Sequence, residues 1–398
     1  MTPASSQIDH LLAHGVSEVY PTPGALAEAL SSGRRLRIYV GVDPTSPSLH
    51  IGHAMQFRKL REFQDLGHEV ILLIGSFTAM IGDPTDKLAV RKQLTSEEVV
   101  ANAKTYKKQA AKILRFTGEN PAKLMFNHKW LSKMSFSQVV DLASHFTVQQ
   151  MMERDMFEKR LLEGKPIHLH EFFYPLMQGY DSVAMDVDVE IGGSDQIFNM
   201  LAGRTLMKAM KGKEKFVLAV KLLTNDEGKK MSKSEGGFIA LTDAPEDMFG
   251  KLMAMGDSMI LPYFELVVGL PSSELDQIRT ELSSGVNPRD IKLRLAETIT
   301  SMYHTVAAAK RAKKHFISVF SQKEMPTEIV DVQVPVGVSV IQALVSASFA
   351  TSNGEARRLI EQGGVKLGDA VVTDVQAVVS SLPVILQKGK RHFARLVV

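Results

Sequence analysis

The stretch from residue 39 to residue 53 constrains the fold of this chain more than any other. It contains a strand pattern, a loop and the start of a helix, in that order. Residues 37–42 alternate and are rich in β-branched side chains, which predicts a buried strand. Residues 43–48 include two prolines and small hydroxyl residues, so the strand cannot continue there. From His50 onward apolar residues recur at helical spacing, which predicts a helix that begins at this histidine.

Two histidines, His50 and His53, lie three residues apart on the first turn of that predicted helix. A first turn has unsatisfied backbone N–H groups and the positive end of the helix dipole, so it suits an anion such as a phosphate. A short His-x-x-His pattern is weak evidence by itself, and it also fits surface or metal-binding histidines. A metal site would lack a nearby cysteine or carboxylate partner in the sequence. The pair by itself therefore leaves these alternatives open.

A second strand follows the predicted helix. Residues 69–74 form a nearly continuous apolar run that ends at Gly75, and a loop then extends to Lys87. Strand, helix and strand in this order predict a βαβ unit with parallel strands and a right-handed crossover. Ligands of such open α/β sheets bind beyond the carboxyl ends of the strands. We therefore expect a ligand site where the loops 43–48 and 75–87 meet.

The loop 82–87 excludes two common nucleotide motifs. It is no Walker A loop, because no glycine precedes Lys87 and no serine or threonine follows it. The sequence also lacks a Gly-x-Gly-x-x-Gly fingerprint, which disfavours a nicotinamide enzyme. Asp83 stands before a proline in this loop. It is a candidate ligand-binding carboxylate or simply a turn residue.

Three polar residues share one face of a further predicted helix. Tyr174, Gln178 and Asp181 stand at positions i, i+4 and i+7, with apolar residues around them. A phenol, an amide and a carboxylate in apolar surroundings could bind a small polar ligand. The alternative is an exposed polar stripe. His168 and His170 precede this helix, beside Glu171, and we interpret both as surface histidines at a strand end rather than as metal ligands.

A glycine pair follows another predicted strand, over residues 187–191. Gly192 and Gly193 allow close approach of the backbone to a ligand, and the carboxylate of Asp195 could bind a ribose hydroxyl.

Asn353 is the expected cap of the helix predicted over 354–362. The remaining expected elements are helices over 8–12, 25–30, 95–116, 135–162, 339–346 and 354–362, a strand over 216–223, helical structure interrupted by prolines over 244–320, and short strands after 363.

Charge and composition narrow the class of protein. The chain has no cysteine, which excludes disulfides and thiolate metal sites and fits a reducing cytosol. Its longest apolar runs are too short to span a bilayer, and no secretory signal is apparent at the amino end. The net charge is only +3, yet residues 91–116 carry seven basic and two acidic side chains. Such clustering is typical of a polyanion-binding protein, or of a solvated helix face.

A second motif changes the interpretation of the histidine pair. Residues 229–234 have the sequence Lys-Lys-Met-Ser-Lys-Ser, and Lys230 stands 180 residues after His50. Together with His-Ile-Gly-His, this motif resembles the two signatures of class I aminoacyl-tRNA synthetases. Over most of its length the chain is similar to the bacterial tyrosyl-tRNA synthetases. Its tail resembles the S4 RNA-binding domain through residues 353–360 and 363–366.

The resemblance implies an α/β fold with four parts. They are a Rossmann-like catalytic domain with a parallel sheet over 1–243, a helical anticodon-side domain over 244–320, a linker over 321–334 and a small α+β S4-like domain over 335–398. Tyrosine is favoured over tryptophan by the Tyr174 helix face, by residues 192–196 and by the tail. The implied activity is that of a tyrosine–tRNA ligase acting on L-tyrosine, ATP with Mg²⁺ and tRNA(Tyr), as a cytoplasmic homodimer with no membrane association and no metal site of its own. An RNA-binding protein on a retired synthetase fold and another nucleotidyltransferase of this superfamily are the alternatives.

The same resemblance implies roles for individual residues. The tyrosine-binding residues would be Tyr39, Asp83, Tyr174, Gln178, Asp181 and Gln196. The catalytic residues around the ATP phosphates would be Thr45, His50, His53, Lys230 and Lys233. Further ATP contacts would come from Gly41, Asp43, Lys87, Arg91, Gly193, Asp195 and Ser234. Contacts to RNA would come from Arg357, Arg358 and Lys366.

Overall fold

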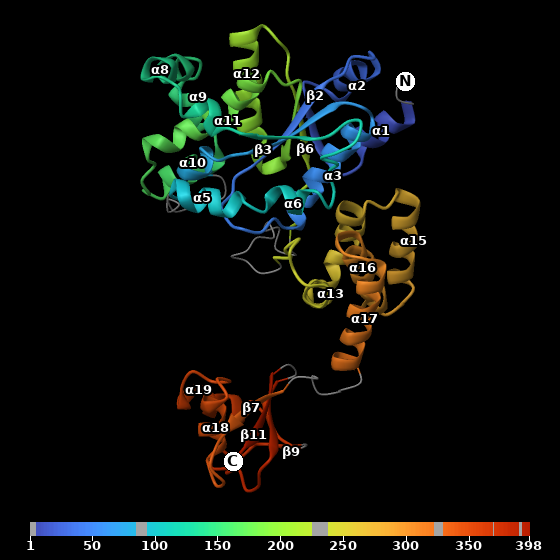
Figure 1. Cartoon of the computed structure of the whole chain (residues 1–398), viewed down its shortest axis with the longest axis vertical. Helices are drawn as coiled ribbons and strands as arrows, with labels where there is room; N and C mark the ends of the chain where they lie inside the picture. Colours follow the sequence, from blue (N-terminus) through green and yellow to red (C-terminus); the bar gives the residue numbers. More distant parts are fainter. Residues whose placement is uncertain (1–4, 85–93, 225–237, 322–328, 369, 390–391) are drawn as a thin grey trace. The chain divides into compact units, whose positions relative to one another are not determined.

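The computed structural model describes residues 5–84, 94–224, 238–321, 329–368, 370–389 and 392–398 (Figure 1). The chain divides into two compact units, Met1–Lys313 and Lys314–Val398. Each unit has its own β-sheet and its own core. The units are therefore described separately.

The first unit is built on a six-stranded sheet in the order β1-β6-β5-β2-β3-β4. Strand β1 is antiparallel to β6, and the other neighbours are parallel. The predicted strands 37–42 and 69–74 are confirmed with the same bounds, and the other two predicted strands are confirmed with shifted ends. Strands β1 and β4 were not predicted. The bounds are β1 Val16–Tyr20, β2 Arg37–Val42, β3 Glu69–Ile74, β4 Lys123–Phe126, β5 Val189–Gly193 and β6 Phe216–Val220.

The direction in which successive strands are added to the sheet reverses between β2 and β5. Helix α3 (Ile51–Asp65) connects β2 to β3, and α12 (Ile197–Lys211) connects β5 to β6 in the opposite direction across the sheet. Right-handed crossovers that run in opposite directions place their helices on opposite faces. Ligands of such sheets bind in a crevice beyond the carboxyl ends of the strands at this point, and we use the word crevice for the region beyond β2 and β5. The predicted parallel βαβ unit is thus confirmed and lies at this crevice.

Helix α11 (Leu169–Met185) carries the predicted polar face and packs against α12. Glycine makes this contact possible, because a Cβ atom on Gly179 would lie 2.9 Å from Leu206 Cδ1 and 3.1 Å from the backbone nitrogen of Gly203. His168 caps this helix and His170 lies in its first turn, so the predicted strand end is wrong; His168 is exposed, as predicted, and His170 is half-buried. Glu171 is buried and accepts hydrogen bonds from Arg160 at 2.6 and 2.8 Å, which explains this carboxylate without a metal.

Two long predicted helices are broken in the structure. The segment 95–116 forms α5 and α6 and then turns, because Asn102 and Tyr106 turn toward the loop after β2 and donate hydrogen bonds to its carbonyls. The segment 135–162 forms three helices, two of which begin at capping boxes of Ser135 and Thr147. The remaining helices before the glycine pair are α1 Ser5–Ala13, α2 Pro23–Ser31, α4 Thr78–Ile81, α5 Ser96–Ala103, α6 Tyr106–Ala110, α7 His128–Leu131, α8 Phe136–Ser144, α9 Val148–Met152 and α10 Asp155–Leu162.

The helical region after residue 244 is confirmed. Two of its prolines, Pro245 and Pro288, stand at the first position of a helix, where a missing N–H has no effect. The elements are α13 Pro245–Ala254, α14 Ile260–Pro262, the π-helical segment Tyr263–Val268, α15 Ser272–Ser283, α16 Pro288–Tyr303 and α17 Val306–Ser321. Among the described residues, no helix has the length and apolar character needed to cross a membrane.

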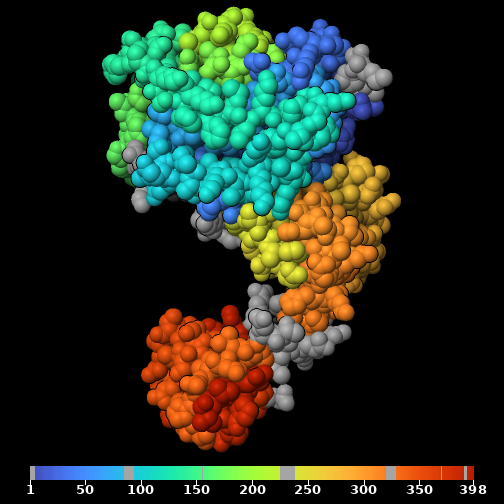
Figure 2. All heavy atoms as spheres, in the orientation of Figure 1, coloured from blue at the N-terminus to red at the C-terminus, as the bar shows by residue number. Residues whose placement is uncertain are grey.

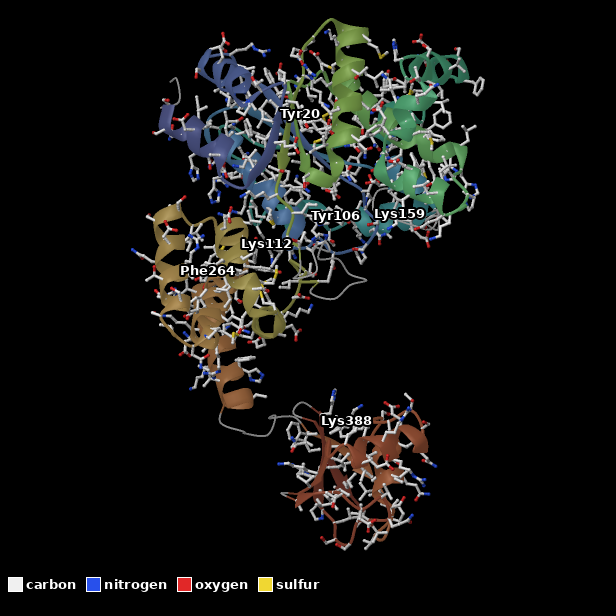
Figure 3. The ribbon with its side chains drawn as sticks, turned by 180° about the vertical axis from the view of Figure 1, so that it is seen from behind. Tyr20, Tyr106, Lys112, Lys159, Phe264 and Lys388 are labelled. Atoms are coloured by element: carbon white, nitrogen blue, oxygen red, sulfur yellow. The ribbon has the colours of Figure 1, made fainter. Side chains whose placement is uncertain are left out.

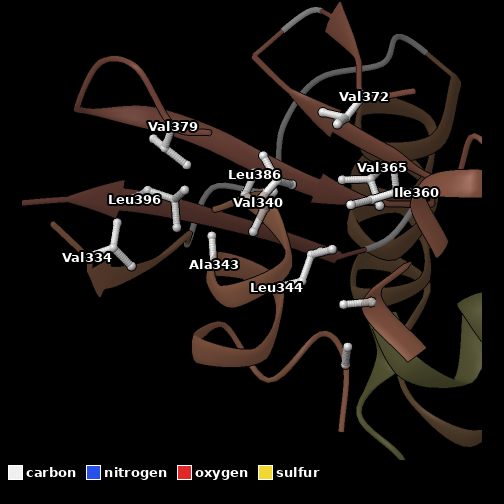
Figure 4. Packing of buried hydrophobic residues seen from close by; sticks show 12 residues of the cluster. Val334, Val340, Ala343, Leu344, Ile360, Val365, Val372, Val379, Leu386 and Leu396 are labelled. Atoms are coloured by element: carbon white, nitrogen blue, oxygen red, sulfur yellow. The ribbon is translucent and has the colours of Figure 1, made fainter. Parts of the chain in front are cut away.

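The second unit packs two helices on a five-stranded sheet of order β7-β11-β10-β8-β9. Figure 4 shows side chains of α18 and of the strands, among them Val340, Leu344, Leu386 and Leu396, meeting in one core. Strand β7 lies inside the expected linker 321–334 and pairs in parallel with β11. The bounds are β7 Val330–Gln333, α18 Val340–Ser346, α19 Asn353–Glu361, β8 Val365–Leu367, β9 Ala370–Val371, β10 Val384–Lys388 and β11 His392–Val397.

The cap of α19 differs from the prediction. Ser352 has an extended backbone, and its hydroxyl accepts the backbone N–H of Glu355 at 3.2 Å. Asn353 is the first helical residue, so its prediction as the cap is wrong. A cap residue must have a non-helical backbone so that its side chain can accept an N–H of the first turn, and Ser352 rather than Asn353 has that conformation.

Candidate active site

The site is built around Asp43, the first residue after β2. Its Oδ2 accepts a hydrogen bond from the Tyr174 hydroxyl at 2.9 Å, and its Oδ1 accepts one from Thr78 Oγ1 at 2.7 Å. Gly75, at the end of β3, leaves room for this arrangement, since a Cβ atom there would overlap Asp43 and Thr78. Asp43 therefore ties α11 and α4 to the carboxyl edge of the sheet.

A chain of hydrogen bonds continues from Thr78 to Asp181. Asn127 Nδ2 donates to Thr78 Oγ1 at 3.0 Å and to Asp181 Oδ2 at 3.1 Å. Trp130 Nε1 donates to Asp181 Oδ1 at 2.7 Å. Both donors follow β4, a strand that we did not predict, so their part in the site was missed. A short apolar run, residues 124–126, was the only signal in the sequence.

Burial determines the electrostatics of Tyr39, Tyr174 and Asp181, which together form the wall of the site. Asp181 is 3% exposed, and loss of water raises the pKa of its carboxyl well above the ordinary value, although the Trp130 and Asn127 hydrogen bonds oppose this. Burial also raises the pKa of the Tyr39 and Tyr174 hydroxyls, so both stay protonated at neutral pH. The wall thus offers two phenolic hydroxyls and a desolvated carboxyl, groups that exchange hydrogen bonds with another hydroxyl.

The predicted face of α11 is confirmed as an inward face. Tyr174 is 6% exposed, which excludes the alternative of an exposed polar stripe. Gln178 Nε2 donates to Glu190 Oε1 of β5 at 2.9 Å. The Tyr39 hydroxyl lies 3.1 Å from Ser182 Oγ, the residue after Asp181. Residues from α11, β2 and β5 therefore form one continuous polar surface inside the unit.

Asp83 and Gln196 meet across the crevice. Asp83 lies in the loop after α4, and its Oδ2 accepts a hydrogen bond from Gln196 Nε2 at 2.7 Å. Arg154 Nη2 lies 3.8 Å from the other carboxylate oxygen of Asp83. At the end of β5, a Cβ atom on Gly193 would overlap the carboxylate of Asp195, so this side chain folds back over the glycine. The buried Arg154 was not among the predicted residues.

The two histidines cap helix α3. His50 Nδ1 accepts the N–H of Gly52 at 3.0 Å, and His53 Nδ1 accepts the N–H of His50 at 3.2 Å. Their ring centroids are 3.9 Å apart. Because each neutral ring accepts at Nδ1, its proton lies on Nε2, which makes that atom a donor beside the positive end of a helix. The described residues contain no cluster of histidine and acidic side chains that could hold a metal ion.

Residues 238–241, which come shortly after the lysine signature in the chain, are hydrogen-bonded to the histidine turn. The backbone N–H of Ile51 donates to the carbonyl of Ile239 at 3.1 Å, and the N–H of Leu241 donates to the carbonyl of Leu49 at 2.8 Å. The rings of Phe238 and His50 are 5.4 Å apart. Five predicted residues lie outside the described residues, namely Lys87, Arg91, Lys230, Lys233 and Ser234.

Helix α6 holds the loop that leads to His50. The Tyr106 hydroxyl donates to the carbonyl of Ser46 at 2.6 Å. Gln109 donates to the carbonyl of Pro47 at 2.9 Å and accepts the N–H of Leu49 at 2.8 Å. Tyr106 and Lys112 are labelled in Figure 3, and Figure 2 shows the part of the chain that contains α5 and α6, in cyan, across the front of the first unit. These residues were not predicted.

The remaining predicted residues are solvent-exposed. Gly41 lies in β2 and Thr45 in the loop that α6 holds, and both are exposed. In the second unit, the three expected RNA contacts are also exposed: Arg357 and Arg358 on α19, and Lys366 on β8.

Comparison with known sequences identifies the family. Residues 31–321 match the family model of tRNA synthetases class I (W and Y). The chain is 44% identical over 402 residues to a tyrosine–tRNA ligase of Carboxydothermus hydrogenoformans, with 97% of each chain covered. It is 45% identical to tyrosine–tRNA ligase 2 of Vibrio cholerae, with 96% of each chain covered.

Solved structures of tyrosyl-tRNA synthetases have the same fold as this chain. A C-terminally truncated mitochondrial tyrosyl-tRNA synthetase of Aspergillus nidulans superposes with a TM-score of 0.65 at 25% identity, covering 79% of this chain and 94% of that chain. The tyrosyl-tRNA synthetase of Archaeoglobus fulgidus complexed with L-tyrosine has the same fold, with a TM-score of 0.63 at 22% identity over 78% of this chain and 100% of that chain. Because the family model spans most of the chain and the curated relatives match nearly all of it, this chain belongs to the tyrosine–tRNA ligases, within the class I tRNA synthetases (W and Y).

Proposed function

We propose that the crevice beyond β2 and β5 activates L-tyrosine with ATP and then transfers it to tRNA(Tyr). In the first step the tyrosine carboxylate attacks the α-phosphorus of ATP, giving tyrosyl-adenylate and pyrophosphate. In the second step a ribose hydroxyl of the terminal adenosine of tRNA attacks the activated carbonyl. The observation that carries the proposal is the hydrogen-bond chain that links Asp181 to Asp43, at the start of the loop that leads to the histidine turn.

Asp181 and Tyr39 bind the phenolic hydroxyl of tyrosine. Both are almost fully buried, at 3% and 1% exposure. A phenylalanine ring would make none of the hydrogen bonds that these two groups offer to a phenolic hydroxyl, which is how tyrosyl-tRNA synthetases themselves reject phenylalanine. Asp83, Tyr174 and Gln178 bind the substrate ammonium, and Gln196 aligns the substrate carboxylate. The bond between Gln196 and Asp83 supports adjacent positions for these two roles.

ATP lies over the carboxyl ends of β2 and β5. Asp195 and Gly193 bind its ribose, and Gly41 and Asp43 line the nucleotide side of the crevice. The phosphates lie against the amino end of α3, where the two imidazole Nε2 donors and the helix dipole favour negative charge. The phosphate contacts are Thr45, His50, His53, Lys87, Arg91, Lys230, Lys233 and Ser234.

Catalysis needs no side-chain base, because the attacking carboxylate is already ionised. The residues act by positioning the reactants and stabilising charge on the pentacovalent phosphorus. Mg²⁺ enters with ATP as part of the substrate, held by phosphate oxygens and water, which is the usual manner for this ion at nucleotides.

The second unit serves as an S4-like RNA-binding domain, and because β7 belongs to its sheet, this domain begins before the expected bound at residue 335. Its exposed Arg357, Arg358 and Lys366 contact the tRNA backbone, as basic side chains do in RNA complexes. Residues 244–320 form the anticodon-side domain, and residues 1–243 the catalytic domain. The enzyme works in the cytoplasm, where its tRNA is charged.

The active enzyme is a homodimer. Six large apolar side chains on α8 to α11 are exposed by more than half of their surface, whereas soluble monomers seldom expose a large apolar patch. They are Phe136 at 84%, Val140 at 53%, Val148 at 71%, Leu161 at 63%, Leu162 at 82% and Leu169 at 73%.

The test of the function is ATP–pyrophosphate exchange measured with each amino acid in turn. We expect exchange with tyrosine alone, followed by transfer to tRNA(Tyr). Exchange with tryptophan in place of tyrosine would assign the chain to the sister specificity. RNA binding without any exchange would instead indicate a protein that has lost the enzymatic activity of its fold.

A further inference from the structure

A lysine is buried beneath the polar surface of the crevice. Lys215 stands just before β6 and is 0% exposed. Its ammonium pairs with the carboxylate of Glu190 in β5 and donates to the carbonyl of Met200 at 3.0 Å. Gly203 of α12 provides the space, because a Cβ atom there would overlap the lysine nitrogen. A charge in such a position is costly unless it is paired, so its partner is the key to its role.

Glu190 connects this lysine to the amino-acid site. Its Oε1 accepts a hydrogen bond from Gln178 Nε2 at 2.9 Å, and Ser182 Oγ lies 3.4 Å from its Oε2. Glu190 also stands opposite Tyr39 in the pairing of β5 with β2. An ionised carboxylate can only accept hydrogen bonds. Glu190 therefore accepts its hydrogen bond from the NH₂ group of Gln178, and the carbonyl oxygen of the Gln178 amide must point away from Glu190.

We propose that Lys215 is a positioning residue for tyrosine: by keeping Glu190 ionised, it fixes the Gln178 amide with its carbonyl oxygen toward the substrate ammonium. The inference deepens the proposed function and rests on the role of Gln178 in it. Lys215 itself touches no substrate.

The physical reason lies in the protonation of a buried carboxyl. Without the lysine, Glu190 would be a buried carboxylate with no counter-charge, and such groups take up a proton instead. A protonated carboxyl can donate a hydrogen bond to an amide oxygen. The Gln178 amide could then turn over and present its NH₂ group to the ammonium, where donor faces donor and the contact is lost.

A pair of ligands that differ only in the ammonium separates this role from simple support of the fold. L-Tyrosine carries the ammonium, whereas 3-(4-hydroxyphenyl)propionate keeps the phenol and the carboxylate without it. In the full-length Lys215→Met enzyme we expect tyrosine binding to weaken by about 10- to 100-fold, the usual size of a lost hydrogen bond to a charged group. Inhibition by the propionate should be unchanged. Equal weakening of both ligands would overturn the inference.

Lys59→Met is the matched control. Lys59 is also buried, at 4% exposure, and its ammonium pairs with Glu62 at 2.7 Å and donates to the carbonyl of Leu11 at 2.8 Å. Its loss removes a buried ammonium that has no bond to Gln178 or Glu190. We expect this variant to bind tyrosine and the propionate in the wild-type ratio, and a change in that ratio as large as that of Lys215→Met would overturn the specific role of Lys215.

A double variant keeps the test decisive if Lys215→Met fails to fold. Lys215→Met with Glu190→Gln removes both charges and leaves a neutral pair of similar size, so the fold is retained. The new amide at 190 can both donate and accept, so it fixes no orientation of Gln178. We expect the preference of the folded double variant for tyrosine over the propionate to fall by about 10- to 100-fold. A wild-type preference in this variant would refute the positioning role.

Gln178→Ala separates the inference from the proposed function. If this variant keeps the wild-type preference for tyrosine over the propionate, the ammonium role of Gln178 is wrong, and the inference fails with it. If Gln178→Ala loses the preference and both Lys215 variants keep it, the proposed function stands and only the role of Lys215 is refuted.

Discussion

At the scale of single residues, the site depends on groups that the fold withdraws from water. Asp181 would be an ordinary carboxylate on a surface, but in the structure it is held by Trp130 and Asn127 and its pKa is raised by burial. His50 and His53 are oriented by the N–H groups that their own Nδ1 atoms accept. The chemical character of each residue thus follows from its partners, and substitutions should act on one substrate at a time.

Asp181→Ala should weaken tyrosine far more than ATP. The variant removes the carboxyl that we propose binds the phenol, leaves the Trp130 donor unpaired and leaves Asn127 with only its bond to Thr78. From the cost of an unmade buried hydrogen bond, the KM for tyrosine should rise by about 10- to 100-fold in pyrophosphate exchange. The KM for ATP should stay close to that of the wild type. An equal rise in both constants would contradict the specificity role.

Lys233→Ala should slow the formation of tyrosyl-adenylate and leave tyrosine binding nearly intact. A lysine that meets the phosphates acts mainly on charge that develops in the transition state. Removal of one such contact lowers rates by about 10²–10³-fold in other enzymes. Single-turnover adenylate formation with saturating tyrosine measures this rate, and equilibrium dialysis measures tyrosine binding. Lost affinity for tyrosine would show that the lysine has another role.

At the scale of elements, helix α6 matters because it fixes a loop rather than a face of the sheet. Carbonyls of the loop 43–49 are bound by the side chains of Asn102 on α5 and of Tyr106 and Gln109 on α6. The amino end of α3 follows this loop directly. Precise placement of the histidine turn therefore depends on a helix that contains none of the predicted site residues.

Gln109→Leu should raise the KM for ATP and spare tyrosine binding. The variant leaves the N–H of Leu49 without its partner and the carbonyl of Pro47 with only the Thr105 hydroxyl, at 3.3 Å, so we expect a loss of about 1–3 kcal/mol of stability. Kinetics with varied ATP and thermal unfolding measure the two effects.

Gln64→Leu is the control for that substitution. Gln64 is buried in the same way, at 1% exposure, and its amide binds the backbone of Arg115 and Asn120. It should lose comparable stability without a change in the KM for ATP. A rise in the KM for ATP in both variants would mean that general destabilisation is the cause.

At the scale of the whole molecule, the chain consists of two compact units, each with a separate core. The crevice and every described residue around it belong to the first unit. The apolar side chains on α8 to α11 belong to the first unit too, whereas the expected RNA contacts of the tail lie in the second. Activation, assembly and RNA binding should therefore respond to different changes.

Leu162→Asp should convert the proposed homodimer into a monomer. A charge at a position that is 82% exposed costs little in the isolated chain but is unfavourable in an apolar interface. Light scattering after gel filtration measures the mass. Val336→Asp, at 60% exposure in the second unit, is the control and should stay dimeric. A dimeric Leu162→Asp enzyme would exclude these helices as the interface.

A chain that ends at residue 321 should still activate tyrosine but charge tRNA poorly. The truncation removes the second sheet and leaves all described site residues of the first unit in place. Pyrophosphate exchange should remain near that of the full chain, while aminoacylation of tRNA(Tyr) should fall by at least about tenfold, since several basic contacts are lost. Loss of exchange would show that the units depend on each other.

The sequence determined the parts of this protein that depend on local pattern. The strands β2 and β3, the start of α3 at His50 and the inward face of α11 follow from alternation, helical spacing and loop residues. The two signatures led to the synthetase family, and the comparisons confirm it. These features are readable because each is encoded within a few neighbouring residues.

The tertiary structure decided what distant residues make together. Asn127 and Trp130 join the site only because β4 pairs with β3, and Glu190 meets Lys215 only because β5 and β6 are neighbours. The bend after α5 likewise depends on hydrogen bonds to a loop 60 residues earlier in the chain, such as the bond from Tyr106 to Ser46. Hydrogen bonds and ion pairs of this kind leave no periodic trace in a sequence, because their geometry exists only once the strands and helices are packed.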